Sequence, residues 1–318
     1  MLNKIFKVHN HGHVRVVDYM GSDEAVVQMA RVSYGDGTKT VNEDRGLIRY
    51  LMRHRHTSPF EGCVLKLHLK MPIFIARQWV RHRTASMNEY SARYSEMRDE
   101  FFIPENYQVQ AQSKTNKQGS EGEIAPDESA TFISSVKNRS RECYETYQYG
   151  LESNIAREMS RIVLPLNTYT EFYWQMNLHN LLHFCSLRSD PHAQKEIRDY
   201  SDIILHGIIK EWVPHTYEAF MDYVMNAESF SHMEMQLLRT LLGSNNVSES
   251  FMTEHFKLSK REATDFVNKL NLKSNNLPLD THESSNNLRT VIPVEENPLP
   301  SFCYGYMSFN TYDNKDAK

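Results

Sequence analysis

The chain has 318 residues, of which 40% are hydrophobic and 24% charged, and its formal net charge is −4 at pH 7. This composition is typical of a soluble globular protein, and the length suffices for one large domain or two, each with its own core. The negative balance excludes a general attraction to nucleic acid or acidic membranes, and no segment approaches the ~18 consecutive apolar residues of a membrane span.

The four cysteines lie far apart and form no C-x-x-C pair: Cys63, Cys143, Cys185 and Cys303. Because no apolar N-terminal segment precedes them, we expect reduced thiols in a cytoplasmic protein. Each cysteine is expected to pack as a small hydrophobic residue rather than to act as a nucleophile.

Near the N-terminus, histidines alternate with other residues at His9, His11 and His13. On an extended segment these side chains would share one face, but no cysteine or carboxylate pattern accompanies them, so we expect no metal site. Beyond them the patterns predict a strand over 14–17, a helix from Asp23 to 32 that Asp23 caps, a turn-rich loop over 33–37 and a helix over 42–53.

The clearest strand pattern is an alternation of Leu65, Leu67, Leu69 and Met71 with Lys66, His68 and Lys70. This pattern predicts a strand with one buried and one polar face. Upstream, Pro59 is expected to hold residues 54–61 extended. Downstream, Pro72 ends the strand and favours a helix over 73–83, which is followed by a loop from Thr84 onward.

An arginine-rich cluster spans residues 77–93 and contains one carboxylate, Glu89, against Arg77, Arg81, His82, Arg83 and Arg93. Arginine suits fixed, bidentate contact with phosphate, and Gln78, Ser86, Asn88 and Ser91 add hydrogen-bonding groups. A salt-bridged surface helix and an RNA-gripping patch are the alternatives. Since no Rossmann, P-loop, H-E-x-x-H or G-x-S-x-G motif occurs, the residues alone indicate only a binder of a phosphorylated, nucleotide-like ligand.

In the second half, the polar residues 108–128 predict an exposed loop insertion, and helices are predicted over 129–160 and 169–187. On the second of these helices His179 and His183 share a face, which spacing alone attributes to the polar edge of an amphipathic helix. Asp190 and Pro191 are expected to cap and begin a further helix that runs to 225. Arg188 would then lie at a helix junction, where its side chain can be directed into a cleft.

The composition changes from Ser229 onward. Ser231 with Glu234, and Ser259 with Glu262, have the spacing of capping boxes and predict helices over 232–242 and 260–270. Residues 271–300 are rich in Asn, Ser and Pro, which predicts a partly disordered linker and tail. We therefore divide the chain into a domain over 1–228 and a helical appendage over 229–318.

Residues 81–94, R-H-R-T-A-S-M-N-E-Y-S-A-R-Y, resemble the R-H-R-x-x-S-x-N-E-x-S-x-R-Y motif of flavin-dependent thymidylate synthases. Residues 56–61 resemble the family's H-x-[TS]-P-F-E segment, residues 77–79 its R-Q-W, and residues 157–167 and 187–194 its second half. The resemblance covers residues 13–225. We find no counterpart for 108–128 or 229–318.

The resemblance implies an α+β (mixed α/β) fold, in which long helices flank a small antiparallel sheet, and makes 1–228 the catalytic domain. Members of the family methylate dUMP to dTMP, with carbon from methylenetetrahydrofolate and reducing equivalents from NADPH through bound FAD. They form homotetramers whose active sites lie at subunit interfaces. We expect a cytoplasmic enzyme of this kind, with no metal, nucleic-acid or membrane partner.

The resemblance also implies roles for individual residues. The dUMP set is Gln78, Arg81, Glu89, Tyr90, Ser91, Ala92, Arg93, Arg161 and Arg188. The FAD set is Ser58, Arg81, His82, Arg83, Glu89, Asn177, His179 and His183, with Ser33, His56 and Glu61 as further candidates at the flavin or folate edge. Arg188 is the implied catalytic residue, because a fixed cation beside the uracil favours its N3-deprotonated form.

The chain departs from the family pattern at four positions. Gly62 stands where many members have His, and Ala92 where Gly is frequent. His179 and His183 stand where some members have Arg and Asn, which makes their flavin contacts less secure than that of Asn177. None of these departures removes a group that the chemistry requires.

Overall fold

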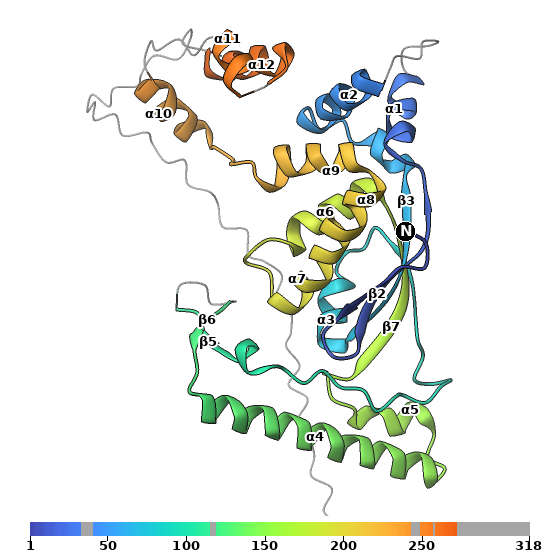
Figure 1. The fold of residues 1–318 in the computed structure, drawn as a ribbon. Helices are drawn as coiled ribbons and strands as arrows, with labels where there is room; N and C mark the ends of the chain where they lie inside the picture. Colours follow the sequence, from blue (N-terminus) through green and yellow to red (C-terminus); the bar gives the residue numbers. More distant parts are fainter. Residues whose placement is uncertain (33–40, 115–118, 243–248, 257, 272–318) are drawn as a thin grey trace, which may run out of the picture. The chain divides into compact units, whose positions relative to one another are not determined.

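The computed structural model describes residues 1–32, 41–114, 119–242, 249–256 and 258–271 (Figure 1). The chain divides into two compact units, Met1–Ser229 and Phe230–Lys318. Ser33 and the loop predicted over 33–37 lie outside the described residues, as do Cys303 and the predicted tail from 272 onward.

The first unit is built on a five-stranded antiparallel sheet, whose strands follow the order β1-β2-β3-β7-β4. The strands are β1 (Ile5–Val8), β2 (Gly12–Met20), β3 (Val64–Pro72), β7 (Tyr169–Asn177) and β4 (Ser86–Glu89). With the helices that pack on it, this sheet confirms the expected α+β class. The short strand predicted over 14–17 is the middle of β2, and its hairpin partner β1 was not predicted.

The two faces of the sheet differ as the alternation in β3 predicts. Leu67 and Leu69 are fully buried and lie opposite Trp174 and Phe172 of β7. Helices α3 (Ile73–Trp79), α6 (Leu178–Arg188) and α7 (Lys195–Asp202) cover this apolar face (Figure 1). The opposite face carries polar side chains, of which Lys66 and His68 are half-buried and Lys70 is buried. Burial of the apolar face, at about 25 cal/mol per Å², is the main stabilising term.

The prediction of a helix over 169–187 is wrong in its first half, which forms the inner strand β7. Thr170, Phe172, Trp174 and Met176 are buried, whereas Tyr173 and Gln175 between them are exposed. This two-residue period, carried by aromatic and β-branched residues, is the signal of a strand. Helix α6 therefore begins only at Leu178, and the Asn177 side chain caps it by accepting from the Asn180 N–H at 2.9 Å.

The elements around the arginine-rich cluster also differ from the prediction. Helix α3 ends at Trp79 rather than at residue 83, so Arg77 and Arg81 do not form an i, i+4 pair on one helix. The predicted loop after Thr84 contains an edge strand, β4, in which Asn88 lies opposite Tyr173. Upstream, residues 54–61 are not fully extended, because Pro59 lies in the first turn of a 3-10 helix, η2 (Ser58–Gly62).

Helices α1 (Asp23–Arg31) and α2 (Val41–Arg53) confirm the two predicted helices near the N-terminus. The predicted cap is wrong, because Ser22 occupies the N-cap of α1 and Asp23 lies inside the helix. The buried Asp23 carboxylate instead accepts from the backbone N–H groups of His215 and Thr216, at 2.8 and 3.0 Å. It therefore caps a helix far away in the sequence, α9 (Pro214–Phe220).

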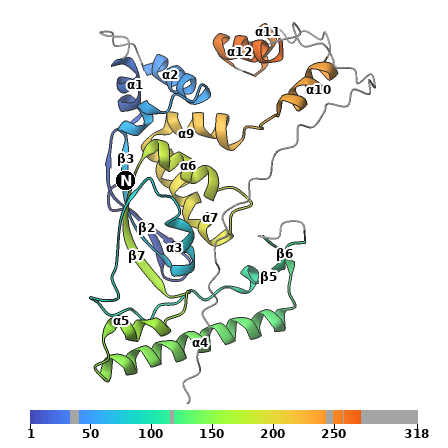
Figure 2. The same ribbon diagram turned by 180° about the vertical axis from the view of Figure 1, so that it is seen from behind.

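The long helix predicted over 129–160 is α4 (Pro126–Glu152), which ends earlier than expected. A turn at Asn154, with φ of 58°, separates it from α5 (Arg157–Ser160) and the 3-10 turn η4 (Arg161–Val163). The described residues of 108–128, a segment predicted as a loop insertion, are mostly exposed. They contain a hairpin of β5 (Gln110–Gln112) and β6 (Ser120–Glu123) after η3 (Asn106–Gln108). Figure 2 shows α4 and α5 running along the end of the sheet away from α2.

The helix predicted from Asp190 to 225 is interrupted. Gln194, not Asp190, is the N-cap of α7, and Asp190 accepts from the His192 backbone N–H in the preceding turn at 2.7 Å. The helix continues as a π-helical segment, η5 (Ile203–Ile209), and α8 (Lys210–Trp212). Pro214 lacks an N–H and starts α9 anew, and η6 (Met221–Met225) follows.

The second unit contains α10 (His232–Leu242), α11 (Glu249–His255) and α12 (Lys260–Asn271). Both predicted capping boxes are confirmed. The Ser231 N–H donates to the Glu234 carboxylate at 2.7 Å, the Ser259 N–H donates to Glu262 at 2.9 Å, and each serine hydroxyl accepts from the glutamate N–H. Helix α11 was not predicted. Across both units, no helix of the described residues is long and apolar enough to cross a membrane.

Candidate active site

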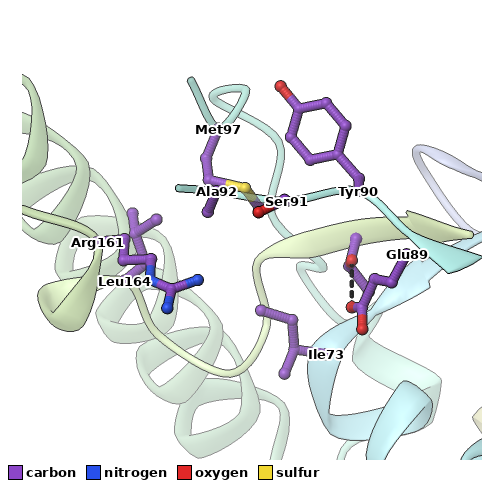
Figure 3. A pocket seen from close by; sticks show the side chains of 9 residues that line it. Ile73, Glu89, Tyr90, Ser91, Ala92, Met97, Arg161 and Leu164 are labelled. Atoms are coloured by element: carbon purple, nitrogen blue, oxygen red, sulfur yellow. Dashed lines mark hydrogen bonds between the residues drawn. The ribbon is translucent and has the colours of Figure 1, made fainter. Parts of the chain in front are cut away.

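A cavity of about 370 Å³ opens beside the edge strand β4 (Figure 3). It collects five residues of the predicted dUMP set, namely Glu89, Tyr90, Ser91, Ala92 and Arg161, and its other lining residues are Ile73, Met97, Leu164 and Thr170. Gln78, Arg81, Arg93 and Arg188, the remaining members of that set, do not line it. Two of these four, Gln78 and Arg188, form a second group elsewhere in the same chain.

Backbone hydrogen bonds hold the loop that forms one wall of the cavity. The Tyr90 N–H donates to the Glu171 carbonyl of β7 at 2.9 Å and so extends the β4–β7 pairing by one residue. The N–H groups of Tyr94 and Ser95 both donate to the Ser91 carbonyl at 3.1 Å. The Tyr90 hydroxyl donates to the Glu96 carbonyl at 2.6 Å. The Ser91 hydroxyl itself accepts from the Arg93 backbone N–H at 3.3 Å, so main-chain groups hold it in place.

The cavity presents both signs of charge. The buried Thr170 hydroxyl donates to Glu89 Oε1 at 2.6 Å, which fixes the only carboxylate of the lining (Figure 3). From η4 the Arg161 guanidinium extends into the cavity, and no carboxylate of the described residues pairs with it. The Arg161 guanidinium and the Ser91 hydroxyl both line the cavity, and two such donors are suited to an oxyanion such as phosphate.

A second group of site residues lies where the C-terminal end of α6 meets the turn after α3. Arg188 donates through Nε to His82 Nε2 at 2.8 Å and through Nη2 to the Gln78 carbonyl at 3.4 Å. The Gln78 amide in turn donates to Gln194 Oε1 at 2.5 Å. Arg188 is thus held by one side chain and one backbone carbonyl, and its orientation depends on the protonation state of His82.

His82 must be neutral in this arrangement, because its Nε2 accepts the hydrogen bond. Burial, followed by the Arg188 and His183 charges, lowers the pKa of His82 from 6.5 to about 4. Burial also lowers the pKa of Arg188, although a guanidinium remains charged at neutral pH. The proton of the neutral imidazole therefore resides on Nδ1.

The other predicted residues are more dispersed. Arg93 pairs with Glu158 at 3.1 Å, with both side chains 55% exposed, and Arg81 and Arg83 are exposed in the turn after α3. Helix α6 and strand β7 both contact η2, the element that contains Ser58 and Glu61, and His179 and His183 lie on α6 itself. Ser58, Glu61 and His56 are exposed. At Gly62, the space that a side chain would need is taken by Met29.

Sequence reasoning missed four lining residues of the cavity: Ile73, Met97, Leu164 and Thr170. Thr170 matters most, because it is the one that positions a predicted ligand residue. It was placed on a helix, where its contact with Glu89 could not be anticipated. The alternation of Thr170, Phe172, Trp174 and Met176 with the residues between them was the signal that would have placed it on a strand.

Residues 15–215 match the family described as "Thymidylate synthase complementing protein". This match spans more than half of the chain and includes both groups of site residues. The chain belongs to this family. The resemblance drawn from residues 81–94 is thereby confirmed.

Relatives of the family match most of the chain. The flavin-dependent thymidylate synthase of Wolbachia pipientis wMel is 50% identical over 268 residues, which are 84% of this chain and 93% of that one. That of Ehrlichia ruminantium (strain Gardel) is 51% identical over 271 residues, 85% and 89% of the two chains. The crystal structure of the UMP/dUMP methylase PolB from Streptomyces cacaoi, bound with 5-Br dUMP, has a TM-score of 0.63 at 36% identity and covers 69% of this chain and 98% of that chain.

The extent of these matches corrects one expectation. The first unit holds residues 1–229, whereas the Wolbachia relative matches 268 residues of this chain. The match therefore extends into the second unit. The expectation that nothing beyond residue 229 has a counterpart is wrong.

Proposed function

We propose that the protein methylates dUMP to dTMP as a flavin-dependent thymidylate synthase, with the unit Met1–Ser229 as its catalytic part. The observation that carries this function is the cavity that gathers residues 89–92 and Arg161, in a chain of this family. The similar Streptomyces protein, which was crystallised with a dUMP analogue, supports a uridine nucleotide as the ligand.

In this proposal the cavity holds the nucleotide by its phosphate. Donors to phosphate oxygens come from the Ser91 hydroxyl and from the Arg161 guanidinium, which pairs with no carboxylate in the described part of the chain. Arg93 joins them when it leaves Glu158. Glu89, which Thr170 orients, accepts from donor groups of the sugar or base. Tyr90 and Ala92 line the wall, while Gln78 and Arg81 complete the dUMP set.

Arg188 is the proposed catalytic residue. Its guanidinium is charged at any pH at which the enzyme works, and His82 and Gln78 fix its direction. Next to the uracil such a cation stabilises the negative charge that develops when N3 loses its proton. The half-buried setting strengthens this effect, because partial exclusion of water raises the energy of each charge interaction.

The residues proposed for FAD fit its mixed chemistry. Exposed Arg81 and Arg83 suit a diphosphate, the neutral His82 offers a ring nitrogen, and the Asn177 amide retains donors after its oxygen accepts from Asn180. Ser58, Glu89, His179 and His183 extend the same polar region, with His56, Glu61 and Ser33 at its edge. When bound, FAD supplies the transfer of reducing equivalents. We propose NADPH as their source and methylenetetrahydrofolate as the carbon donor.

We also propose a cytoplasmic homotetramer in which subunits share active sites. The support is that Arg188 does not line the cavity of its own chain, although the proposed chemistry requires it beside the uracil. A subunit complementation experiment tests this directly. At a dUMP concentration far below the KM of the Arg161→Ala variant, mixed tetramers of Arg161→Ala and Arg188→Ala chains should regain part of the activity that each variant lacks alone. A mixture that stays inactive would contradict shared sites.

The absorption spectrum of the purified protein tests the function itself. We expect a flavin spectrum that changes on addition of dUMP, and formation of dTMP when methylenetetrahydrofolate and NADPH are supplied. A colourless protein that also fails to take up added FAD would contradict the proposal. Tight, salt-sensitive binding of oligonucleotides without turnover would favour the RNA-binding alternative instead.

A further inference from the structure

Three metal-ligating side chains converge on the polar face of the sheet: His13 of β2, His68 of β3 and Glu171 of β7. The strand register explains the convergence. His13 lies opposite Lys70 and His68 lies opposite Arg15, so the two imidazoles are diagonal neighbours on one face. Glu171 is related to His68 in the same way on the other side of β3. One ligand atom from each residue lies within 4.8 Å of the others.

This set differs from the row of alternating histidines near the N-terminus, which is His9, His11 and His13. His9 turns to Asp199, with its Nε2 3.1 Å from the carboxylate, and His11 is exposed. Only His13 of that row reaches the polar face. Its partners come from strands more than 50 and 150 residues away, one of which was predicted as a helix, so no local pattern indicated them.

Two imidazoles and one carboxylate form a ligand set that zinc adopts in proteins. The distance between His13 Nε2 and His68 Nδ1 is 3.5 Å. Two zinc–nitrogen bonds of about 2.05 Å at a tetrahedral angle place their nitrogens about 3.4 Å apart. Glu171 Oε2 lies 3.2 Å from His68 Nε2, the other nitrogen of that ring, so in this rotamer it orients His68 as an outer partner, and it binds an ion at Nδ1 by changing rotamer.

The charges around the cluster favour neutral imidazoles. Burial and the neighbouring His68 lower the pKa of His13 to about 4, although Glu171 opposes this shift. The pKa of His68 is also lowered, chiefly by burial and against the pull of Glu171. At neutral pH a metal ion therefore displaces few protons from these nitrogens.

Three cations face the cluster. Lys70 pairs with Glu100 at 2.5 Å, and Arg98 lies 3.5 Å from Glu171 Oε1, on the oxygen that does not face His68. Arg15 Nη2 is 3.3 Å from His68 Nδ1 and therefore competes for this nitrogen. The same guanidinium nitrogen is also 3.3 Å from the Tyr173 hydroxyl, an alternative acceptor to which it can turn.

We propose that His13, His68 and Glu171 bind one divalent ion of the zinc class, which joins β2, β3 and β7. The ion would brace β7 where this strand supports the cavity, since the Glu171 carbonyl accepts from the Tyr90 N–H and the next residue, Thr170, holds Glu89. This site does not line that cavity and is independent of the proposed function.

The test uses the full-length protein, freed of metal by a chelator and titrated with Zn²⁺ by calorimetry, with elemental analysis after gel filtration. We expect one tightly bound equivalent and a rise in thermal midpoint. His13→Gln and His68→Gln should lose that equivalent, and Glu171→Gln should weaken binding by about 10- to 100-fold. The control His192→Gln removes an exposed histidine that lies 2.9 Å from the Asp190 carboxylate, and it should bind as the wild type does.

Arg15→Gln provides a variant in which binding increases. Removal of the competing guanidinium should tighten Zn²⁺ binding, a gain that misfolding cannot produce. The proposal is overturned if the wild-type protein binds no stoichiometric Zn²⁺, or if His13→Gln binds it equally well. It is also overturned if only His192→Gln loses the ion.

Discussion

The two groups of site residues are held in place by different means. Residues 89–92 at the cavity are fixed by backbone hydrogen bonds, which continue the β4–β7 pairing and close the turn at Ser91. Arg188 is fixed by a histidine side chain and a carbonyl, at the end of a helix. A backbone-held loop survives the loss of one side chain, whereas a side-chain network does not. Substitutions at the two groups should therefore differ in size and in kind.

The largest effect is expected at the side-chain network. Arg188→Ala should lower kcat for dTMP formation by about 10²- to 10³-fold, because the charge that stabilises the deprotonated uracil is lost. Arg188→Lys should recover little, since an ammonium group cannot donate to His82 and Gln78 in the same geometry. Steady-state kinetics with a flavin count on each variant measures this. Unchanged turnover in Arg188→Ala would assign the activation of uracil to another residue.

At the cavity, Arg161→Gln should act on binding rather than on turnover. Loss of one charged hydrogen-bond donor to phosphate should weaken dUMP binding by about 10- to 100-fold, with kcat at saturating dUMP nearly unchanged. Titration calorimetry with dUMP gives the affinity. Arg157→Gln is the matched control, because Arg157 is a nearby exposed arginine that pairs with Glu96 at 3.4 Å outside the cavity lining. Equal losses in both variants would point to a general charge effect.

A smaller effect is expected where a side chain supports the backbone-held loop. Thr170→Val removes the hydroxyl that orients Glu89 and should raise KM for dUMP by about 5- to 10-fold. Thr168→Val is the control: it removes a hydroxyl that donates to the Pro165 carbonyl at 2.7 Å, two residues away and outside the cavity lining. It should lower stability without changing KM. If Thr170→Val leaves KM unchanged, Glu89 does not depend on this contact.

What the sequence allowed us to predict depends on how far apart in the chain the contacting residues lie. The capping boxes at Ser231 and Ser259 were correct because both partners lie within one turn of helix. The motif at 81–94 predicts site residues, but the strand β4 within it arises from pairing with β7, some 85 residues away. The capping of α9 by Asp23 joins residues 192 and 193 positions apart. No local pattern could indicate these contacts.

The error at 169–177 has another cause, because the strand signal was present in the chain. Thr170, Phe172, Trp174 and Met176 alternate with polar or exposed residues, and aromatic side chains favour strands. The predicted helix over 169–187 instead crossed Asn177, which is in fact the N-cap of α6. That error hid both Thr170 at the cavity and Glu171 on the polar face.

The smallest expected effect concerns pH and the side-chain network alone. In the folded protein the pKa of His82 is about 4, against 6.5 for an unperturbed histidine. As pH falls from 6.5 toward 4, the unfolded chain binds a proton that the folded one excludes, so stability decreases over this range and is fully present above it. His82→Gln retains an acceptor for Arg188 but cannot titrate. Its thermal midpoint should therefore fall less steeply between about pH 7 and pH 5 than that of the wild type.

The decline in the thermal midpoint of His82→Gln will not vanish, because the pKa values of His13 and His68 are also lowered. His11→Gln, at an exposed histidine, should keep the wild-type slope. Identical slopes in His82→Gln and the wild type would show that Arg188 is not held against a neutral imidazole, and the contrast between the two groups would then lose its electrostatic basis.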